Sequence, residues 1–146
     1  DLLQSRGTSY VAYTHGNDRW GNYQDVRLPS QVYRTSNNLC LEGTVLFASL
    51  MEGIGMIPVI VLRPGHAYIG WLDPDGPVVF KGGRFFFLET TAIARHDFDA
   101  ALMFAAEDFE RNRGGFESPL ASPDYEVMIL AELRKEGYKP QSDPEE

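Results

Sequence analysis

Three side chains of this sequence have the types and the order that nucleophilic catalysis by a thiol requires. Cys40 is the one cysteine of the chain, His66 is one of three histidines, and Glu89 ends an apolar segment. The thiolate is the nucleophilic form of cysteine, histidine accepts and returns a proton near neutral pH, and a carboxylate holds the imidazole in its productive tautomer. We therefore expect Cys40 to be the nucleophile, His66 the general base and Glu89 the residue that orients His66.

The position of Cys40 favours a reactive thiol. If Asn38 caps a helix over residues 39–54, Cys40 lies in its first turn, where unpaired backbone N–H groups and the helix dipole stabilise a thiolate. Such positions lower a cysteine pKa from ~8.5 toward ~3.5 to 7.5. Gly43 and Thr44 are small enough for a substrate backbone to approach. The alternative is that Cys40 is a small buried hydrophobic residue.

Of the three histidines, His66 is the best placed to act as the base. His15 lies in a hydrophilic loop, and His96 precedes Asp97 at a predicted helix start. His66 instead follows Gly65 and opens a predicted strand, which would fix its ring against the core. The alternative is a half-buried histidine with a purely structural partner.

Glu89 ends the apolar strand predicted over residues 84–90. A carboxylate buried there needs a partner, and the ring of His66 would satisfy it. The alternative is that Glu89 reaches solvent at the end of the strand.

Such a site also needs hydrogen-bond donors for the oxyanion. The backbone N–H of Cys40 can supply one. Among side-chain amides the candidates are Gln24 and Gln31, with Asn37 and Asn38 nearer but expected to cap the helix. Gln24 is the preferred candidate.

The elements that would position these residues predict an α+β fold in which a buried helix with an N-terminal cysteine packs on an antiparallel sheet. Helices are predicted over residues 39–54 and 97–113, and strands over residues 56–62, 66–72, 78–80 and 84–90. The segment 125–133 is ambiguous between strand and helix, and 140–146 is an acidic tail. Turns are expected at Pro64–Gly65, over residues 73–77 and at Gly82–Gly83, and Gly114–Gly115 is expected to end the second helix.

The apolar and charged side chains outside the triad are expected to have structural roles. The second helix is expected to turn Phe98, Leu102, Ala105 and Phe109 toward the sheet, and the charges of residues 108–113 to form a solvated face. Most of the aromatic residues are expected in the core, but Tyr68 or Trp71 can line a substrate groove.

Composition limits the classes of function. The 146 residues predict a single domain over residues 1–146, with a core at about 9–113. A net charge of −8 without a basic stripe argues against nucleic-acid binding, and the apolar runs are too short for a membrane span. A single cysteine excludes an internal disulfide, which fits a reducing compartment such as the cytoplasm and leaves an extracytoplasmic location open. Because the chain opens at Asp1, we expect it to be part of a longer protein.

Several short motifs taken together resemble a bacterial subgroup of the transglutaminase-like proteins, a branch of the papain-like superfamily. The matching segments are QDVRLPSQV from Gln24, NLCLEGTVLFASL from Asn38, PGHA from Pro64 and FLETT from Phe87. The resemblance implies a transglutaminase-like core, a triad of Cys40, His66 and Glu89, and Gln24 as the oxyanion donor. Asn38 and Leu39 depart from the subgroup, which usually has a glycine and a small or polar residue before the cysteine.

These observations predict a thiol-dependent amide hydrolase that acts on a peptide or protein through a thioester, without a cofactor. If an amine rather than water resolves the thioester, the same site is a transglutaminase. A second hypothesis is an idle binding or regulatory module of a larger protein. A zinc site made of the same three residues is the least favoured, because short-spaced Cys or His pairs are missing.

Overall fold

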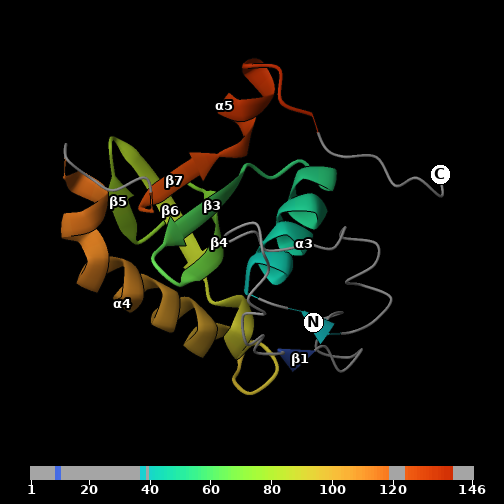
Figure 1. The fold of residues 1–146 in the computed structure, drawn as a ribbon, viewed down its shortest axis with the longest axis vertical. Helices are drawn as coiled ribbons and strands as arrows, with labels where there is room; N and C mark the ends of the chain where they lie inside the picture. Colours follow the sequence, from blue (N-terminus) through green and yellow to red (C-terminus); the bar gives the residue numbers. More distant parts are fainter. Residues whose placement is uncertain (1–8, 11–36, 39, 119–123, 140–146) are drawn as a thin grey trace, which may run out of the picture.

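Alternating apolar side chains build a five-stranded antiparallel sheet at the centre of the part of the chain that can be described, residues 9–10, 37–38, 40–118 and 124–139 of the computed structural model. Figure 1 shows this sheet with the helices α3 (Cys40–Gly53) and α4 (Phe98–Glu117) beside it. The strand order is β5 (Val78–Phe80), β6 (Gly83–Leu88), β4 (His66–Leu72), β3 (Pro58–Arg63) and β7 (Glu126–Ile129). The predicted α+β class, with a helix that begins at the cysteine, is confirmed.

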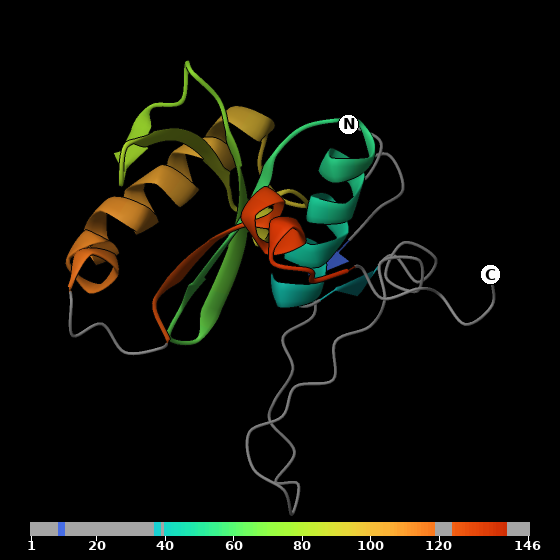
Figure 2. The same cartoon turned by 90° about the horizontal axis from the view of Figure 1, so that it is seen from above.

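The two long helices cover opposite faces of the sheet, as Figure 2 shows from above. Because successive strand residues point to opposite faces, neighbours on β4 contribute to different cores. Tyr68 belongs to an aromatic cluster with Phe87 and Phe109 on the α4 side, and Ile69 belongs to a cluster with Met51 on the α3 side. His66 has the same parity as Tyr68, so its strand position directs it toward the α4 side.

Two tight turns set the register of the hairpins. At the β3–β4 turn, Gly65 has a φ of 74°, and Arg63 is the cross-strand partner of His66. This confirms the predicted Pro64–Gly65 corner. The β5–β6 turn lies one residue earlier than expected, at Lys81 and Gly82, because both have positive φ angles, 45° and 81°, as a two-residue type I′ hairpin requires.

Helix α3 begins at Cys40 and is more buried in its first half than in its last turn. Glu42, Gly43 and Thr44 are buried in the turn after the cysteine, whereas Leu50 in the last turn is 43% exposed. The predicted boundaries are therefore close, but the predicted burial on nearly all sides holds only in part, because Cys40, Leu41 and Val45 are half-buried.

Helix α4 begins as expected and ends later. The side chain of its N-cap, Asp97, accepts a hydrogen bond from the backbone N–H of Ala100. The predicted stop at Gly114–Gly115 is wrong, because the helix continues to Glu117. A Cβ on Gly115 would lie 2.5 Å from the ring of Tyr125, so this glycine serves a close contact and not a helix end.

The predicted apolar face of α4 is correct in its middle and wrong at its start. Ala105 and Phe109 are fully buried and Leu102 is partly buried, but Phe98, the first residue of the helix, is 45% exposed. The second correction concerns Asp108, which was expected on a solvated face and is only 7% exposed.

The C-terminal described segment resolves the ambiguity of residues 125–133 in both directions. β7 pairs with β3, and the helix α5 (Leu130–Lys135) follows it directly. The sheet therefore extends beyond the core expected to end near residue 113. Earlier in the chain, β1 (Ser9–Tyr10) pairs with β2 (Asn37–Asn38) in parallel.

A search of the described residues for membrane spans finds no helix with the length and hydropathy that crossing a bilayer demands.

Candidate active site

Cys40 is the first residue of α3, and its side chain is partly accessible. The pKa of the thiol reflects two backbone hydrogen bonds, one from Ala67 on β4 and one from Leu41 in the first turn of the helix. One turn later, the hydroxyl of Thr44 donates a 2.7 Å hydrogen bond to the carbonyl oxygen of Cys40. The first turn is thus fixed around the sulfur.

His66 opens β4 immediately after the Pro64–Gly65 turn. Its ring lies 5.8 Å from the ring of Tyr68, centroid to centroid, and its side chain is 16% exposed. A strand end that is braced by a tight turn and a buried tyrosine restricts the orientation of the imidazole.

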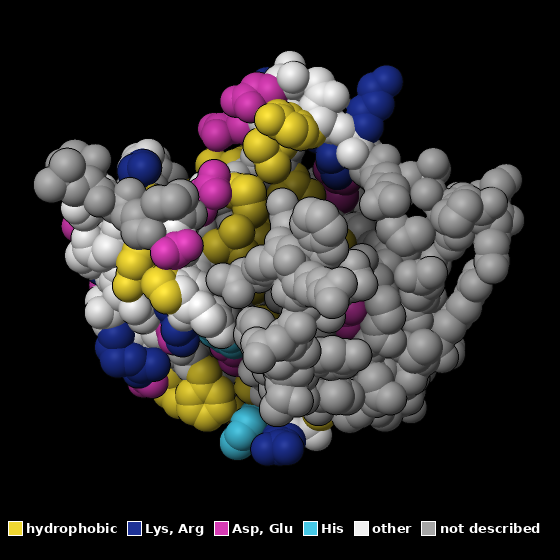
Figure 3. All heavy atoms as spheres, viewed as in Figure 1, with side chains coloured by type: hydrophobic (Ala, Val, Ile, Leu, Met, Phe, Trp, Pro, Cys, Tyr) yellow, Lys and Arg dark blue, Asp and Glu magenta, His cyan; other side chains and the backbone are white. Residues whose placement is uncertain are grey.

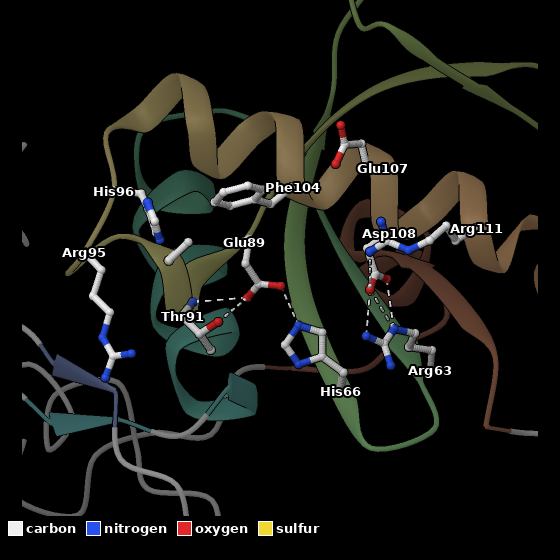
Figure 4. A pocket seen from close by; sticks show the side chains of 11 residues that line it. Arg63, His66, Glu89, Thr91, Arg95, His96, Phe104, Glu107, Asp108 and Arg111 are labelled. Atoms are coloured by element: carbon white, nitrogen blue, oxygen red, sulfur yellow. Dashed lines mark hydrogen bonds and ion pairs between the residues drawn. The ribbon is translucent and has the colours of Figure 1, made fainter.

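Glu89 follows β6 and binds the imidazole directly. Its Oε2 lies 2.5 Å from Nε2 of His66. Its Oε1 accepts hydrogen bonds from the backbone N–H of Thr91 at 3.1 Å and from the Thr91 hydroxyl at 2.8 Å. Figure 4 shows these contacts converging on the carboxylate. Both carboxylate oxygens are therefore held, and Nδ1 is the ring nitrogen left for the thiol.

The pKa values of Cys40 and His66 are shifted in opposite directions. Burial raises the pKa of the Cys40 thiol, but the interaction with His66 and the two backbone N–H groups outweigh burial, so the pKa is lowered from its ordinary value. Burial lowers the pKa of His66, but the interactions with Cys40 and Glu89 outweigh it and raise the pKa to about 9. A lowered thiol pKa beside a raised imidazole pKa favours thiolate and imidazolium at neutral pH.

An open cleft of about 380 Å³ borders the imidazole and the carboxylate of this group. Most of its wall is polar, and it is lined by Arg63, His66, Glu89, Thr91, Ala92, Arg95, His96, Phe104, Glu107, Asp108 and Arg111. Cys40 does not line it, so the cleft approaches the group from the side of His66 and Glu89. Figure 3 shows basic and acidic side chains mixed over α4, the helix that supplies one side of the cleft.

Beside the His66–Glu89 pair lies a second pair of opposite charges. Arg63 donates from Nε to Oδ1 of Asp108 at 2.8 Å and from Nη2 to Oδ2 at 2.6 Å. In Figure 4 the two pairs stand next to each other, both reaching from the β3–β4 hairpin to an acid on a neighbouring element. Arg111 adds a looser contact of 3.8 Å to the same carboxylate.

The structure brings together three of the four predicted catalytic residues. Cys40, His66 and Glu89 are adjacent, whereas Gln24 lies outside the described residues. Tyr68 has no exposed surface, which differs from the expectation that it can line a substrate groove, because strand alternation turns it into the core under α4. Trp71 stacks on Phe86 at 5.2 Å and is not part of the cleft.

Three residues near the site were not anticipated. Thr91 is in the FLETT motif, so its proximity to Glu89 was a usable signal. Arg63 directly precedes the Pro64–Gly65 turn, but nothing in the sequence pairs it with Asp108, 45 residues later.

Among the residues that the structure describes, no group of three His, Cys, Asp or Glu side chains has the arrangement of a metal site.

Comparison with protein-family models, with curated proteins and with solved structures finds no match to this chain.

Proposed function

We propose that this protein is a cysteine hydrolase of amide bonds, with a transglutaminase-like, papain-like core and peptides or proteins as substrates. The observation that carries the proposal is the chain of contacts from the Cys40 thiol through the His66 ring to the Glu89 carboxylate. This arrangement supplies a nucleophile, a base and an orienting acid in the order that thiol catalysis uses.

The first half-reaction forms a thioester. The Cys40 thiolate attacks the carbonyl carbon of the amide, and the negative charge moves to the carbonyl oxygen. The His66 imidazolium then donates its proton to the departing amine as the C–N bond breaks. Because Glu89 binds Nε2, the proton is delivered from Nδ1, the nitrogen on the thiol side.

The second half-reaction regenerates the site. His66, now neutral, takes a proton from water as the oxygen attacks the thioester carbon, and the C–S bond breaks to release the acid and restore the thiolate. The thiol is partly accessible, which gives water access to the thioester as the second substrate. The leaving amine must contact Nδ1 of His66, so the leaving-group portion of the substrate lies on the thiol side of the ring.

A mixed peptide library, read by mass spectrometry, tests this proposal. The wild type is expected to cleave a subset of peptides, while Cys40→Ala and His66→Ala are expected to lose cleavage. His96→Ala, which removes an exposed histidine from the same cleft, is the matched control and should retain it.

Two additions separate hydrolysis from acyl transfer. In heavy-oxygen water, hydrolysis places the label in the new carboxyl group. With a fluorescent primary amine present, a transglutaminase would instead label glutamine side chains. Cleavage that survives Cys40→Ala, or no turnover in either assay, would contradict the proposed hydrolase.

A further inference from the structure

We propose that Arg63 and Asp108 are positioning residues for His66, acting as a charge-balanced clamp that holds the end of the β3–β4 hairpin on α4. This inference rests on the proposed function of Cys40, His66 and Glu89 and goes beyond it, because neither residue of the clamp belongs to the triad.

The geometry makes the clamp specific to the strand end that carries His66. Arg63 and His66 are cross-strand partners on either side of the Pro64–Gly65 turn. The guanidinium of Arg63 binds Asp108 through Nε and Nη2, and its Nη1 donates to the carbonyl oxygen of Pro64 at 3.2 Å. One side chain therefore ties the turn both to itself and to the neighbouring helix.

Asp108 is itself well fixed. Its side chain is 10% exposed, and Asn112 donates a 2.8 Å hydrogen bond to its backbone carbonyl. A carboxylate this buried needs a cation, and a bidentate guanidinium is the partner with the best geometry. The bond thus has a rigid anchor on the α4 side.

The charge balance matters because the clamp adjoins a titrating ring. The ionisable groups that interact with His66 or line the same cleft are Cys40 on α3, Arg63 on β3, Tyr68 on β4, Glu89 after β6, Arg95 and His96 before α4, and Glu107, Asp108 and Arg111 on α4. Within this set, the positive charge of Arg63 and the negative charge of Asp108 offset each other. The pair can therefore hold the hairpin without favouring or opposing the imidazolium.

This arrangement predicts opposite electrostatic effects for its two halves. Asp108→Asn leaves a guanidinium uncompensated and should lower the pKa of His66. Arg63→Met leaves the Asp108 carboxylate without its bidentate partner, with Arg111 3.8 Å away, and should raise the pKa of His66. Each change is expected to be about half a pH unit or more for a unit charge in a partly buried site. A pair that held the hairpin without balancing charge beside the ring would change the His66 pKa in the same direction in both variants.

The experiment measures the imidazole pKa of His66 by NMR titration and the alkylation rate of Cys40 by iodoacetamide in these variants and in the double variant. The double variant should return to the wild-type pKa yet react about three- to tenfold more slowly, in line with the sensitivity of catalysis to small misplacements. Arg113→Met is the matched control, because Arg113 pairs with Glu110 on the same helix, outside the cleft, and should change neither quantity.

If a single variant fails to fold, Arg63→Lys keeps the test decisive. It retains the charge but not the bidentate bond, so the His66 pKa should stay and the alkylation rate should fall. The clamp would be overturned if the His66 pKa moved in the same direction in Asp108→Asn and Arg63→Met, or if these variants kept the wild-type pKa and alkylation rate. Either result would leave the triad proposal intact. A wild-type thiol that is indifferent to His66 would instead overturn the triad proposal.

Discussion

The contact between Glu89 and His66 offers the sharpest test of the site electrostatics. Glu89→Gln removes the negative charge and keeps an oxygen that can accept the Nε2 hydrogen bond. The imidazolium loses a charge-assisted partner in a place where the His66 side chain is only 16% exposed. The imidazolium of His66 should therefore lose its proton more readily in this variant, with little change in the position of the ring.

The size of the effect follows from the strength of the bond. A hydrogen bond to a charged group contributes about 1.5–3 kcal/mol, and one pH unit corresponds to about 1.4 kcal/mol. The pKa of His66 should then fall by about one to two pH units from its wild-type value of about 9.

The assay is an imidazole NMR titration of the wild type, Glu89→Gln and Glu107→Gln, with the His66 resonance assigned by its absence in His66→Ala. Glu107 is the matched control, because it is an exposed acid of the same cleft with no bond to the ring. Its removal should change the pKa by only a few tenths, since solvent and salt screen exposed charges. An unchanged His66 pKa in Glu89→Gln, or an equal fall in Glu107→Gln, would refute the reasoning.

Further predictions concern stability. Gly115→Ala should destabilise the fold by about 1–3 kcal/mol, because its methyl group would meet a tyrosine ring, whereas Gly114→Ala faces open space in the same helix and should stabilise it by about 0.5–1 kcal/mol. Opposite shifts of the melting temperature would support this, and equal shifts would contradict it. Phe109→Ala removes a fully buried ring and should cost about 3–5 kcal/mol in urea unfolding; a loss below 1 kcal/mol would show that the aromatic cluster is not the core. The pKa of His66 is raised from 6.5 in the unfolded chain to about 9 in the folded protein. The stabilisation that Glu89 provides should therefore be complete below pH 6.5 and be lost as the pH rises to about 9. If the difference in unfolding free energy between wild type and Glu89→Gln instead grew over this pH range, the predicted direction of the effect would be wrong.

Much of the fold could be predicted from local sequence patterns. The helix from Cys40 and the strand from His66 came from apolar periodicity and turn residues, which are local properties. Glycine was a reliable signal at the Pro64–Gly65 turn and a misleading one in α4. The sequence at Gly115 predicts a helix stop, but this glycine makes room for the ring of Tyr125, and a contact between side chains of two elements has no local signature.

Residues of the candidate site whose role follows from their chemical type could be predicted from the sequence. Residues whose role depends on their position in the fold could not. Cys40, His66 and Glu89 were identified because few residue types can perform those roles. Asp108 looked like one of several charges on a solvated helix, and only the packing of α4 on the sheet shows that it is buried against Arg63. Tyr68 illustrates the reverse, since an aromatic residue near the site turned out to be core.

The pH dependence of Cys40 alkylation by iodoacetamide, in the wild type and in His66→Ala, tests the central claim most directly. His96→Ala serves as the control for the loss of a nearby histidine. The thiolate–imidazolium pair predicts a thiol that reacts rapidly below about pH 7 in the wild type and in the control, and slowly in His66→Ala. A thiol that reacts only near its unperturbed pKa of about 8.5, with no effect of His66, would contradict the pair and favour a non-catalytic module.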